Sequence, residues 1–165
     1  ILRYFNVCGA SDDGFLGDSK KPSVLLVQNA VRGALGIKPF YLTYPAVDTV
    51  DKSPIRDYVN VVDLSDAHVK ACEYLMDEGK SDIFNLGTGT GNSVLEIVKK
   101  VEEVTGVSIE RKKSPAREGE YAKMVADIRK AEKILNWKSS RSLSQGIHSL
   151  IQWYKKYPHG WSRHV

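Results

Sequence analysis

The stretch from Asp82 to Lys100, DIFNLGTGTGNSVLEIVKK, constrains the fold more than any other part of this sequence. A short apolar segment runs into three glycines, Gly87, Gly89 and Gly91, and an amphipathic helical pattern follows them. A strand, a tight turn and a helix in this order are typical of α/β proteins, in which strands alternate with helices. The same order makes the turn a candidate site for a dinucleotide.

The glycine spacing departs from the dinucleotide fingerprint, Gly-x-Gly-x-x-Gly. The third glycine should stand at Asn92 but comes one residue earlier, although Glu110 could imitate the acid that the fingerprint places on the ribose about 20 residues later. Ser93 and Glu96 have the spacing of a capping box, which begins a helix. Short glycine motifs often match by chance, so we favour a structural turn, tied down by the Asn85 side chain, over a nucleotide site.

Strand and helix patterns alternate along the rest of the chain. Apolar runs and period-two alternation predict a buried strand at residues 1–7 and further strands at 39–44, 55–63, 82–87 and 107–111. Helical periodicity predicts helices at 23–35, from 63 or 65 to 76, and at 93–105, 127–135 and 142–157. Ser23 is the expected N-cap of the first helix, and Gly36 follows its end. This order of elements predicts α/β architecture, with long loops at 8–22 and 45–54.

Composition places the chain among globular domains. Its 165 residues suit one domain, and 42% hydrophobic with 27% charged residues is a globular composition. The net charge of +4, from 24 basic and 20 acidic residues, is spread along the chain, whereas a nucleic-acid-binding protein usually has a dense basic stripe. No apolar run approaches the roughly 20 residues of a membrane span. We therefore expect neither a nucleic acid nor a membrane as partner.

The cysteines and the first residues bear on the setting of the chain. Cys8 and Cys72 form neither a disulfide framework nor a metal-binding pattern, so we expect a cytoplasmic protein with no metal site. The chain opens with ILRYFNV, which lacks a starting Met and is strand-like from its first position. We therefore expect the chain to be a piece of a longer protein.

Three arginine motifs are candidates for binding an anionic ligand. Arg3 lies in RYFN, Arg56 in IRDY and Arg117 in AREGE. The planar guanidinium matches phosphate oxygens. Arg56 and Arg117, with the acids Asp57 and Glu120 close to them in sequence, could clamp a diphosphate and a ribose. Surface ion pairs, which are common and weak, explain the same pattern equally well.

The residues offer no convincing catalytic set. His68 and His148 lie on predicted helices without a nucleophile or a second acid beside them, so a structural role is favoured for both. No tyrosine is followed by a lysine four residues later, which is the spacing of a known proton-transfer pair. We therefore expect no catalytic residue within this chain.

Several longer stretches together resemble the C-terminal part of UDP-glucose 4-epimerases, which belong to the extended short-chain dehydrogenase/reductase group. They are LRYFNVCGA at 2–10, VDTVDKSPIRDYVNVVDLSDAHVKA at 47–71, FNLGTGTGNSVLEIV at 84–98, AREGE at 116–120, VADIRKAEKILNW at 125–137 and WYKKYPHGW at 153–161. They follow the family's order and cover nearly the whole chain. The resemblance implies an incomplete α/β fold: the late strands of a Rossmann-type parallel sheet plus a small α/β substrate-binding domain, over residues 1–165.

In that family the NAD-binding glycines and the catalytic Tyr, Lys and Ser or Thr lie upstream of RYFN, so NAD would be bound mainly by an absent N-terminal part. The resemblance implies that the full-length protein, expected as a homodimer, is an NAD-dependent isomerase. It would interconvert UDP-glucose and UDP-galactose through a 4-keto intermediate, and this chain alone would be inactive. The alternatives are another nucleotide-sugar enzyme of the group (a UDP-N-acetylglucosamine or pentose epimerase, a dehydratase or a decarboxylase) and a non-catalytic nucleotide-binding module.

The resemblance also implies site residues. Tyr4 and Phe5 would border the nicotinamide of NAD. Side chains from several segments would bind the UDP-sugar: Asn6, Leu26, Tyr41, Thr43, Arg56, Arg117, Glu120 and Met124. Of these, Asn6 would hydrogen-bond the UDP-sugar, residues 41–43 would lie along the uracil, and Met124 would shape the sugar pocket.

The two arginines and the acid would bind the diphosphate and the ribose of the ligand. Arg56 and Arg117 would hold the diphosphate, and Glu120, which stands where the family usually has Asp, would bind the uridine ribose. At the first helix, Leu25 replaces a residue that supplies a side-chain hydrogen bond in the family, and Gln28 replaces a proline. These departures leave the preferred sugar open.

Overall fold

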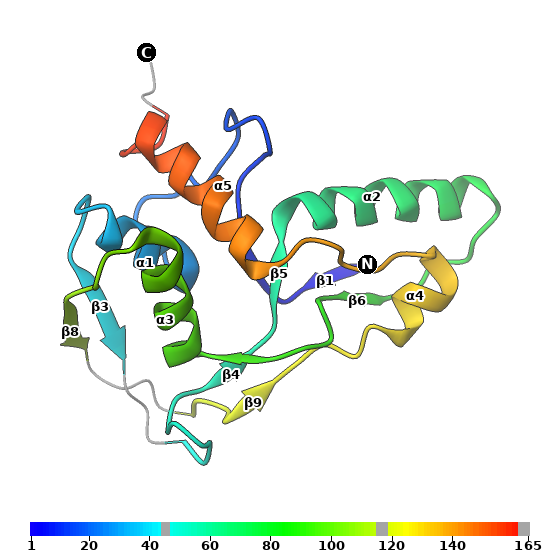
Figure 1. Ribbon diagram of the computed structural model, residues 1–165. Helices are drawn as coiled ribbons and strands as arrows, with labels where there is room; N and C mark the ends of the chain where they lie inside the picture. The colour runs from blue at the N-terminus through cyan, green and yellow to red at the C-terminus, as the bar shows by residue number, and fades with distance from the viewer. Residues whose placement is uncertain (44–46, 115–118, 162–165) are drawn as a thin grey trace.

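The chain folds into an α/β protein whose strands pair mostly in parallel (Figure 1). The computed structural model describes residues 1–43, 47–114 and 119–161. The parallel pairs are β1 Leu2–Tyr4 with β6 Phe84–Leu86, β2 Asn6–Cys8 with β5 Tyr58–Asn60, and β3 Phe40–Thr43 with β8 Arg111–Ser114. A further sheet has β4 Ile55–Arg56 between β7 Asn92–Ser93, which is antiparallel to it, and β9 Lys123–Met124, which is parallel. The predicted α/β class is confirmed.

The helices divide between two lobes, which α5 connects. Their bounds are α1 Leu26–Ala34, α2 Val61–Met76, α3 Val94–Thr105, α4 Arg129–Leu135 and α5 Leu143–Lys156. In Figure 1, β1, β6, α2 and α4 lie on one side and form the first lobe. On the other side α1, α3, β3 and β8 form the second lobe. Helix α5 lies between them, because it packs on α1 and α3 and also on β2 and β5.

Each lobe has its own hydrophobic core. In the second lobe, Trp153, Leu150 and Ile147 of α5 are fully buried against apolar residues of α1, α3 and β3. In the first lobe, Phe84 and Leu86 of β6 are buried with Trp137 and the apolar faces of α2 and α4. Apolar positions at helical or strand spacing therefore end in the interior, as burial of their surface requires.

Side chains of the chain itself set the helix starts. The capping boxes predicted from Ser93 with Glu96 and from Ser142 with Gln145 are both present. Helix α2 begins two residues before the predicted Asp63, because the side chain of Asn60 accepts a hydrogen bond from the Val62 amide (2.9 Å) and caps it.

The predicted N-cap of the first helix is wrong. Helix α1 begins at Leu26, and its N-cap is Leu25, which makes no side-chain capping hydrogen bond. Ser23 lies further upstream, where its carbonyl accepts a hydrogen bond from the Asn29 side chain (3.1 Å). That bond leaves residues 23–25 outside the helix. Gly36 does follow the helix, with the positive φ of 67° that favours glycine.

The strand predicted over residues 1–7 is two strands. The chain changes partner at Phe5, whose amide donates to the Leu86 carbonyl (3.1 Å), so β1 pairs with β6 and β2 with β5. The prediction that this strand is buried is wrong for β1, because Tyr4 is 48% exposed and Arg3 is exposed as well. The apolar pattern of these residues therefore predicts a strand correctly, but it does not predict whether β1 is buried in this chain.

Two other strand boundaries also differ from the prediction. The strand predicted over 55–63 is divided into β4 and β5, which belong to different sheets. The strand predicted over 107–111 begins only at Arg111, because Glu102 of α3 accepts hydrogen bonds from the Ile109 amide (2.9 Å) and the Arg111 side chain (3.0 Å). These bonds tie the segment before β8 to the end of α3.

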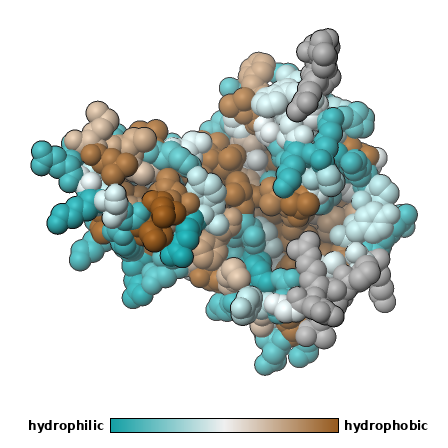
Figure 2. Space-filling view, turned by 180° about the vertical axis from the view of Figure 1, so that it is seen from behind, coloured by the Kyte–Doolittle hydropathy of each residue, from teal (hydrophilic) through white to brown (hydrophobic). Residues whose placement is uncertain are grey.

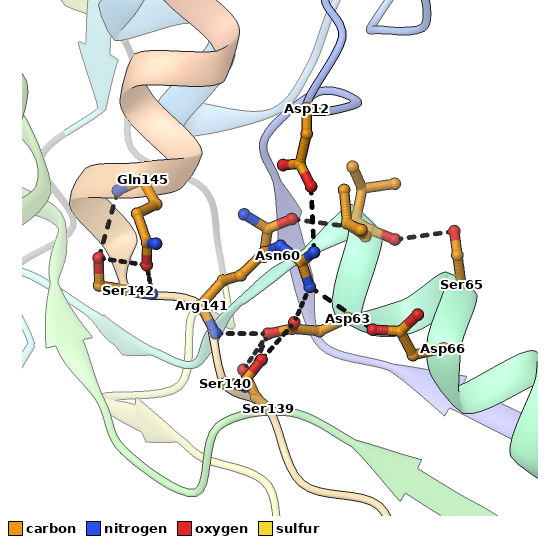
Figure 3. A network of polar contacts seen from close by, with 12 residues as sticks. Asp12, Asn60, Asp63, Ser65, Asp66, Ser139, Ser140, Arg141, Ser142 and Gln145 are labelled. Atoms are coloured by element: carbon orange, nitrogen blue, oxygen red, sulfur yellow. Dashed lines mark hydrogen bonds and ion pairs between the residues drawn. The ribbon is translucent and has the colours of Figure 1, made fainter.

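The carboxylate of Asp63 joins three distant segments in one polar network (Figure 3). It accepts hydrogen bonds from the side chains of Ser139, Ser140 and Arg141 and from the amides of Ser140 and Arg141. Arg141 also contacts Asp12 of the first long loop (3.1 Å). The network therefore holds that loop, the start of α2 and the segment before α5 together.

The first lobe exposes apolar side chains. Seen from behind, it carries a cluster of hydrophobic side chains (Figure 2). Ile1, Leu75 and Ile83 are exposed and line a groove of about 710 Å³ between β1, β6 and α2. None of the described helices has both the length and the apolar composition needed to cross a bilayer.

Candidate functional site

A cavity of about 440 Å³ lies where the segment before α1 meets β2, β3 and the β4–β5 segment. This volume is typical of a small-molecule site. Six of the residues implied as substrate-binding line it, namely Asn6, Leu26, Tyr41, Thr43, Arg56 and Glu120. They come from segments far apart in sequence, so the fold brings the implied residues together in one place.

Arg56 and Glu120 form an ion pair in the cavity wall. Their side chains are 13% and 22% exposed, so the pair is shielded but reaches the cavity. Arg56 Nη1 also donates a hydrogen bond to the Ile55 carbonyl (2.7 Å). A guanidinium has five N–H donors, and the described residues accept from two of its nitrogens. The arrangement leaves Arg56 able to bind an anion in the cavity.

Strand alternation sets which side chains face the cavity. Arg56 and Tyr58 are two residues apart and line it together, whereas Asp57 between them is fully buried on the other side. The register of β2 with β5 pairs Asn6 with Tyr58, which brings Asn6 to the same wall. The period-two pattern of the strand predicted over 55–63 puts Arg56 and Tyr58 on one face, although Tyr58 was not named as a site residue. The same alternation could have identified it.

Tyr58 keeps its proton at neutral pH. Burial raises the pKa of its hydroxyl; the charge of Arg56 opposes this rise, and Cys8 and Glu120 add to it. The pKa therefore lies above the ordinary tyrosine value, and the hydroxyl is a neutral hydrogen-bond donor. Burial also raises the pKa of the Cys8 thiol to about 12, so this cysteine is not ionised at neutral pH.

Asp57 has a different role from the one expected of an acid beside the diphosphate. Its carboxylate accepts hydrogen bonds from the amides of Thr88 (2.8 Å), Gly89 (3.0 Å) and Ala126 (3.2 Å). It also accepts one from the Thr88 hydroxyl (2.7 Å). Asp57 therefore ties down the glycine turn, a role that was expected of Asn85.

The first position of this turn must be glycine because neighbouring atoms leave no room for a side chain. A Cβ on Gly87 would come within 2.5 Å of Asp57 Oδ2 and of the Ala126 Cβ. The turn amides that a dinucleotide phosphate would need already bind the Asp57 carboxylate. These contacts agree with the structural turn that the glycine spacing favours.

Tyr4 lies outside the cavity and contacts α2. Its hydroxyl is 2.7 Å from Nε2 of His68, and Nδ1 of the same ring is 2.7 Å from the Leu64 carbonyl. A carbonyl only accepts, so Nδ1 carries the proton and Nε2 accepts from the Tyr4 hydroxyl. His68 therefore has a hydrogen-bonding role between α2 and β1, in agreement with the structural role favoured for it.

The other implied residues are not among those that line the cavity. Phe5 is half-buried at the change of strand partner. Met124 of β9 is opposite Arg56 in the register and is 44% exposed. Arg117 lies outside the described residues. The contacts implied for these residues and for Tyr4 with NAD, diphosphate or sugar stay predictions.

Two further features of the described residues bear on ligand chemistry. No group of three His, Cys, Asp or Glu side chains in this part of the chain could hold a metal ion. Ser23, which lines the cavity, has a buried hydroxyl oxygen that lacks a hydrogen-bond partner among the described residues. Buried polar atoms are normally satisfied, so the Ser23 hydroxyl is a candidate ligand contact at this end of the cavity.

Comparisons with known proteins identify the relatives of this chain. The model of the NAD dependent epimerase/dehydratase family matches residues 1–87. A UDP-glucose 4-epimerase from Lactobacillus helveticus is 41% identical over 162 residues, which are 97% of this chain and 49% of that protein. A probable UDP-arabinose 4-epimerase from Oryza sativa subsp. japonica is 39% identical over 98% of this chain and 39% of that protein.

A comparison with solved structures finds the same kind of protein as the sequence comparison. The crystal structure of a UDP-glucose 4-epimerase from Bifidobacterium longum, in complex with NAD+ and UDP, matches with a TM-score of 0.90 and 37% identity. The match covers 97% of this chain and 48% of that one. The chain thus spans about half the length of the relatives that it matches, and its strands and helices have the Rossmann-type α/β arrangement of that structure.

Proposed function

Because this chain belongs to the NAD dependent epimerase/dehydratase family, we propose that it is the UDP-sugar-binding portion of a UDP-glucose 4-epimerase. The observation that carries the proposal is the cavity that collects Asn6, Arg56 and Glu120 with three other implied substrate residues. The relatives named UDP-glucose 4-epimerase support the choice of reaction. In this proposal residues 1–165 are the C-terminal substrate-binding region, and the NAD-binding part lies outside them.

The residues of the cavity have distinct roles in the proposed complex. Arg56 would offset the negative charge of the diphosphate, with Arg117 as its partner, because a guanidinium binds phosphate oxygens with paired N–H groups. Glu120 would accept hydrogen bonds from the ribose hydroxyls. Asn6 would hold the sugar end of the ligand, and residues 41–43 of β3 would lie along the uracil. Together these residues would position the substrate.

Bound NAD would supply the redox chemistry of the reaction. The glycine turn at β6 does not suit its diphosphate, because the Asp57 carboxylate already binds the turn amides of Thr88 and Gly89. The aromatic residues Tyr4 and Phe5 are suited to border the nicotinamide, and Tyr4 is half-exposed at the edge of β1. This chain would thus contact one end of NAD, and the rest of the cofactor would be bound elsewhere in the full-length protein.

A pentose sugar is the second candidate substrate. The rice relative, named as a probable UDP-arabinose 4-epimerase, supports this candidate: it is 39% identical to this chain, close to the 41% of the Lactobacillus helveticus UDP-glucose 4-epimerase. Leu25, which cannot provide a side-chain hydrogen bond at the head of α1, also leaves the preferred sugar open. A homodimer in the cytoplasm is proposed for the full-length protein; the free cysteines Cys8 and Cys72 suit that reducing compartment.

The test is product analysis with the complete natural protein and a panel of UDP-sugars. We expect NAD-dependent conversion of UDP-galactose to UDP-glucose, and UDP binding that does not need NAD chemistry. The 165-residue chain alone is expected to convert none of them. A complete protein that binds UDP but epimerises only UDP-pentoses would favour the second candidate, and one that binds no UDP would contradict the proposal.

A further inference from the structure

Tyr58 lies deep in the wall of the proposed substrate cavity. Its residue is 6% exposed, and its ring packs in the hydrophobic core of the second lobe. It nevertheless lines the cavity, next to Arg56 along the strand direction and next to Asn6 across the β2–β5 pair. Tyr58 therefore lies between Arg56, which is implied to bind the diphosphate, and Asn6, which is implied to bind the UDP-sugar.

The Tyr58 hydroxyl differs from that of the other buried tyrosine. Buried tyrosine hydroxyls usually have a hydrogen-bond partner. Tyr154, 1% exposed, follows this rule and donates to Asp18 Oδ2 (3.1 Å). The Tyr58 hydroxyl forms no such bond with any described residue. Its oxygen is also not among the fully buried side-chain atoms without a hydrogen-bond partner, which belong to Ser23, Gln28 and Arg32. Because Tyr58 lines the cavity, a ligand bound there could accept a hydrogen bond from this donor.

The position of Tyr58 relative to Arg56 indicates which part of the ligand its hydroxyl could contact. Arg56 ends β4 and Tyr58 begins β5, and two residues of extended chain span at most about 7 Å between Cα atoms, which is the scale of a diphosphate with its flanking oxygens. Arg56 provides the charge at one end of this interval, and the uncharged Tyr58 hydroxyl provides a single directed donor at the other. A phosphoryl oxygen accepts from both kinds of group.

We propose that the Tyr58 hydroxyl donates a hydrogen bond to a phosphoryl oxygen of the bound nucleotide sugar, on the side of the diphosphate away from Arg56. The inference rests on the proposed function, since it assumes that the cavity binds a nucleoside diphosphate. The Tyr58 hydroxyl would add a neutral, buried hydrogen-bond donor to the charged residues of the site. Such a donor discriminates ligands that carry phosphoryl oxygens from those that do not.

The test compares Tyr58→Phe with Tyr154→Phe in the complete natural protein. Each variant loses one hydroxyl from a buried ring and keeps the ring. Binding of UDP and of uridine is measured by competition calorimetry, and the melting temperature is measured without ligand. For Tyr58→Phe we expect UDP binding to weaken about threefold to tenfold, with uridine binding and the melting temperature unchanged. For Tyr154→Phe we expect a lower melting temperature and unchanged UDP binding.

The outcomes separate this inference from the function on which it rests. If the unaltered protein binds UDP and Tyr58→Phe binds it equally well, the inference is overturned and the proposed function stands. Equal weakening of UDP and uridine binding would also overturn it, because the hydroxyl would then act on the nucleoside. A protein that binds no UDP at all would overturn the proposed function, and the inference with it.

Discussion

Two arginine–carboxylate pairs in this molecule, Arg141 with Asp63 and Arg56 with Glu120, differ in how fully the protein satisfies them. The Asp63 side chain is 1% exposed and accepts hydrogen bonds from three consecutive residues as well as from the guanidinium (Figure 3). Glu120 is 22% exposed and reaches the cavity, and among the described residues its partner is Arg56. A carboxylate whose hydrogen-bonding positions are all filled by the protein holds segments together. An ion pair with fewer protein partners, beside a cavity, can still form hydrogen bonds with a ligand.

The contrast follows from the cost of burying charge. A charge removed from water must be paired and hydrogen-bonded, or it destabilises the fold. Asp63 meets this condition entirely within the protein. The side chains of Arg56 and Glu120 are partly exposed to solvent. Either group can therefore replace its hydrogen-bond partner with a ligand at little energetic cost. Substitutions should therefore change stability at the first pair and ligand affinity at the second.

The largest effect is expected at Asp63. Asp63→Asn should lower the free energy of unfolding by about 3 kcal/mol, because Arg141 loses its buried counter-charge and the serine donors lose part of their acceptor. Urea denaturation measures the change, and UDP binding should stay as it is. Asp127→Asn, in an exposed pair with Arg129, is the control and should leave stability unchanged. An equally stable Asp63→Asn variant would remove the distinction between the two pairs.

The Asp63 contribution should also depend on pH. Burial raises the pKa of this carboxyl, but hydrogen bonds, first from Ser139 and then from Arg141 and Ser140, lower it more, so its native pKa lies below the ordinary value. The unfolded-state pKa is about 3.9. The stabilisation is therefore present above this pH and is lost as the pH falls through the native pKa. The difference in stability between the natural protein and Asp63→Asn should shrink in acid; a difference that grew in acid would contradict the network.

A smaller effect, on affinity, is expected at Arg56. Arg56→Gln should weaken UDP binding by about 2 kcal/mol, roughly 30-fold, because the diphosphate loses a charge-assisted donor. Isothermal calorimetry measures it, with urea denaturation to show that stability changes less than in Asp63→Asn. The control is Arg111→Gln, whose pair with Glu102 is more exposed and lies outside the cavity. If both variants bound UDP equally, Arg56 would be an ordinary surface ion pair.

The sequence predicted the local features of this fold well because neighbouring residues determine them. Ser93 with Glu96 forms a capping box within one turn of helix. This box and the misplaced third glycine argued together against a nucleotide site at the turn. Arg56 was singled out as a candidate because a guanidinium matches phosphate oxygens. The cavity itself was anticipated through the family resemblance, since period and composition left surface ion pairs as an equal alternative.

Contacts between distant segments were beyond the sequence. The partners of Asp63 follow it by 76 to 78 residues, and those of Asp57 in the glycine turn by 31 and 32. No spacing rule connects such positions, so the sequence left Asp57 open between a ligand contact and a surface ion pair, although it holds the turn. Tyr58 was passed over for a related reason: alternation gives its face, but only the fold shows that its hydroxyl forms no hydrogen bond with a described residue.

The smallest effect is expected at Glu120, and it tests the contrast most directly. This carboxylate pairs with Arg56, so an incoming phosphate must share the guanidinium with it. Glu120→Gln removes the competing charge and should strengthen the binding of inorganic pyrophosphate about threefold, the scale of a partly exposed pair. UDP should gain less, because its ribose would lose a charged acceptor, so the preference for UDP over pyrophosphate should fall. Glu102→Gln, outside the cavity, should change neither ligand. Weaker pyrophosphate binding in Glu120→Gln would mean that Glu120 holds Arg56 in place as Asp63 holds Arg141, and the two pairs would then be alike.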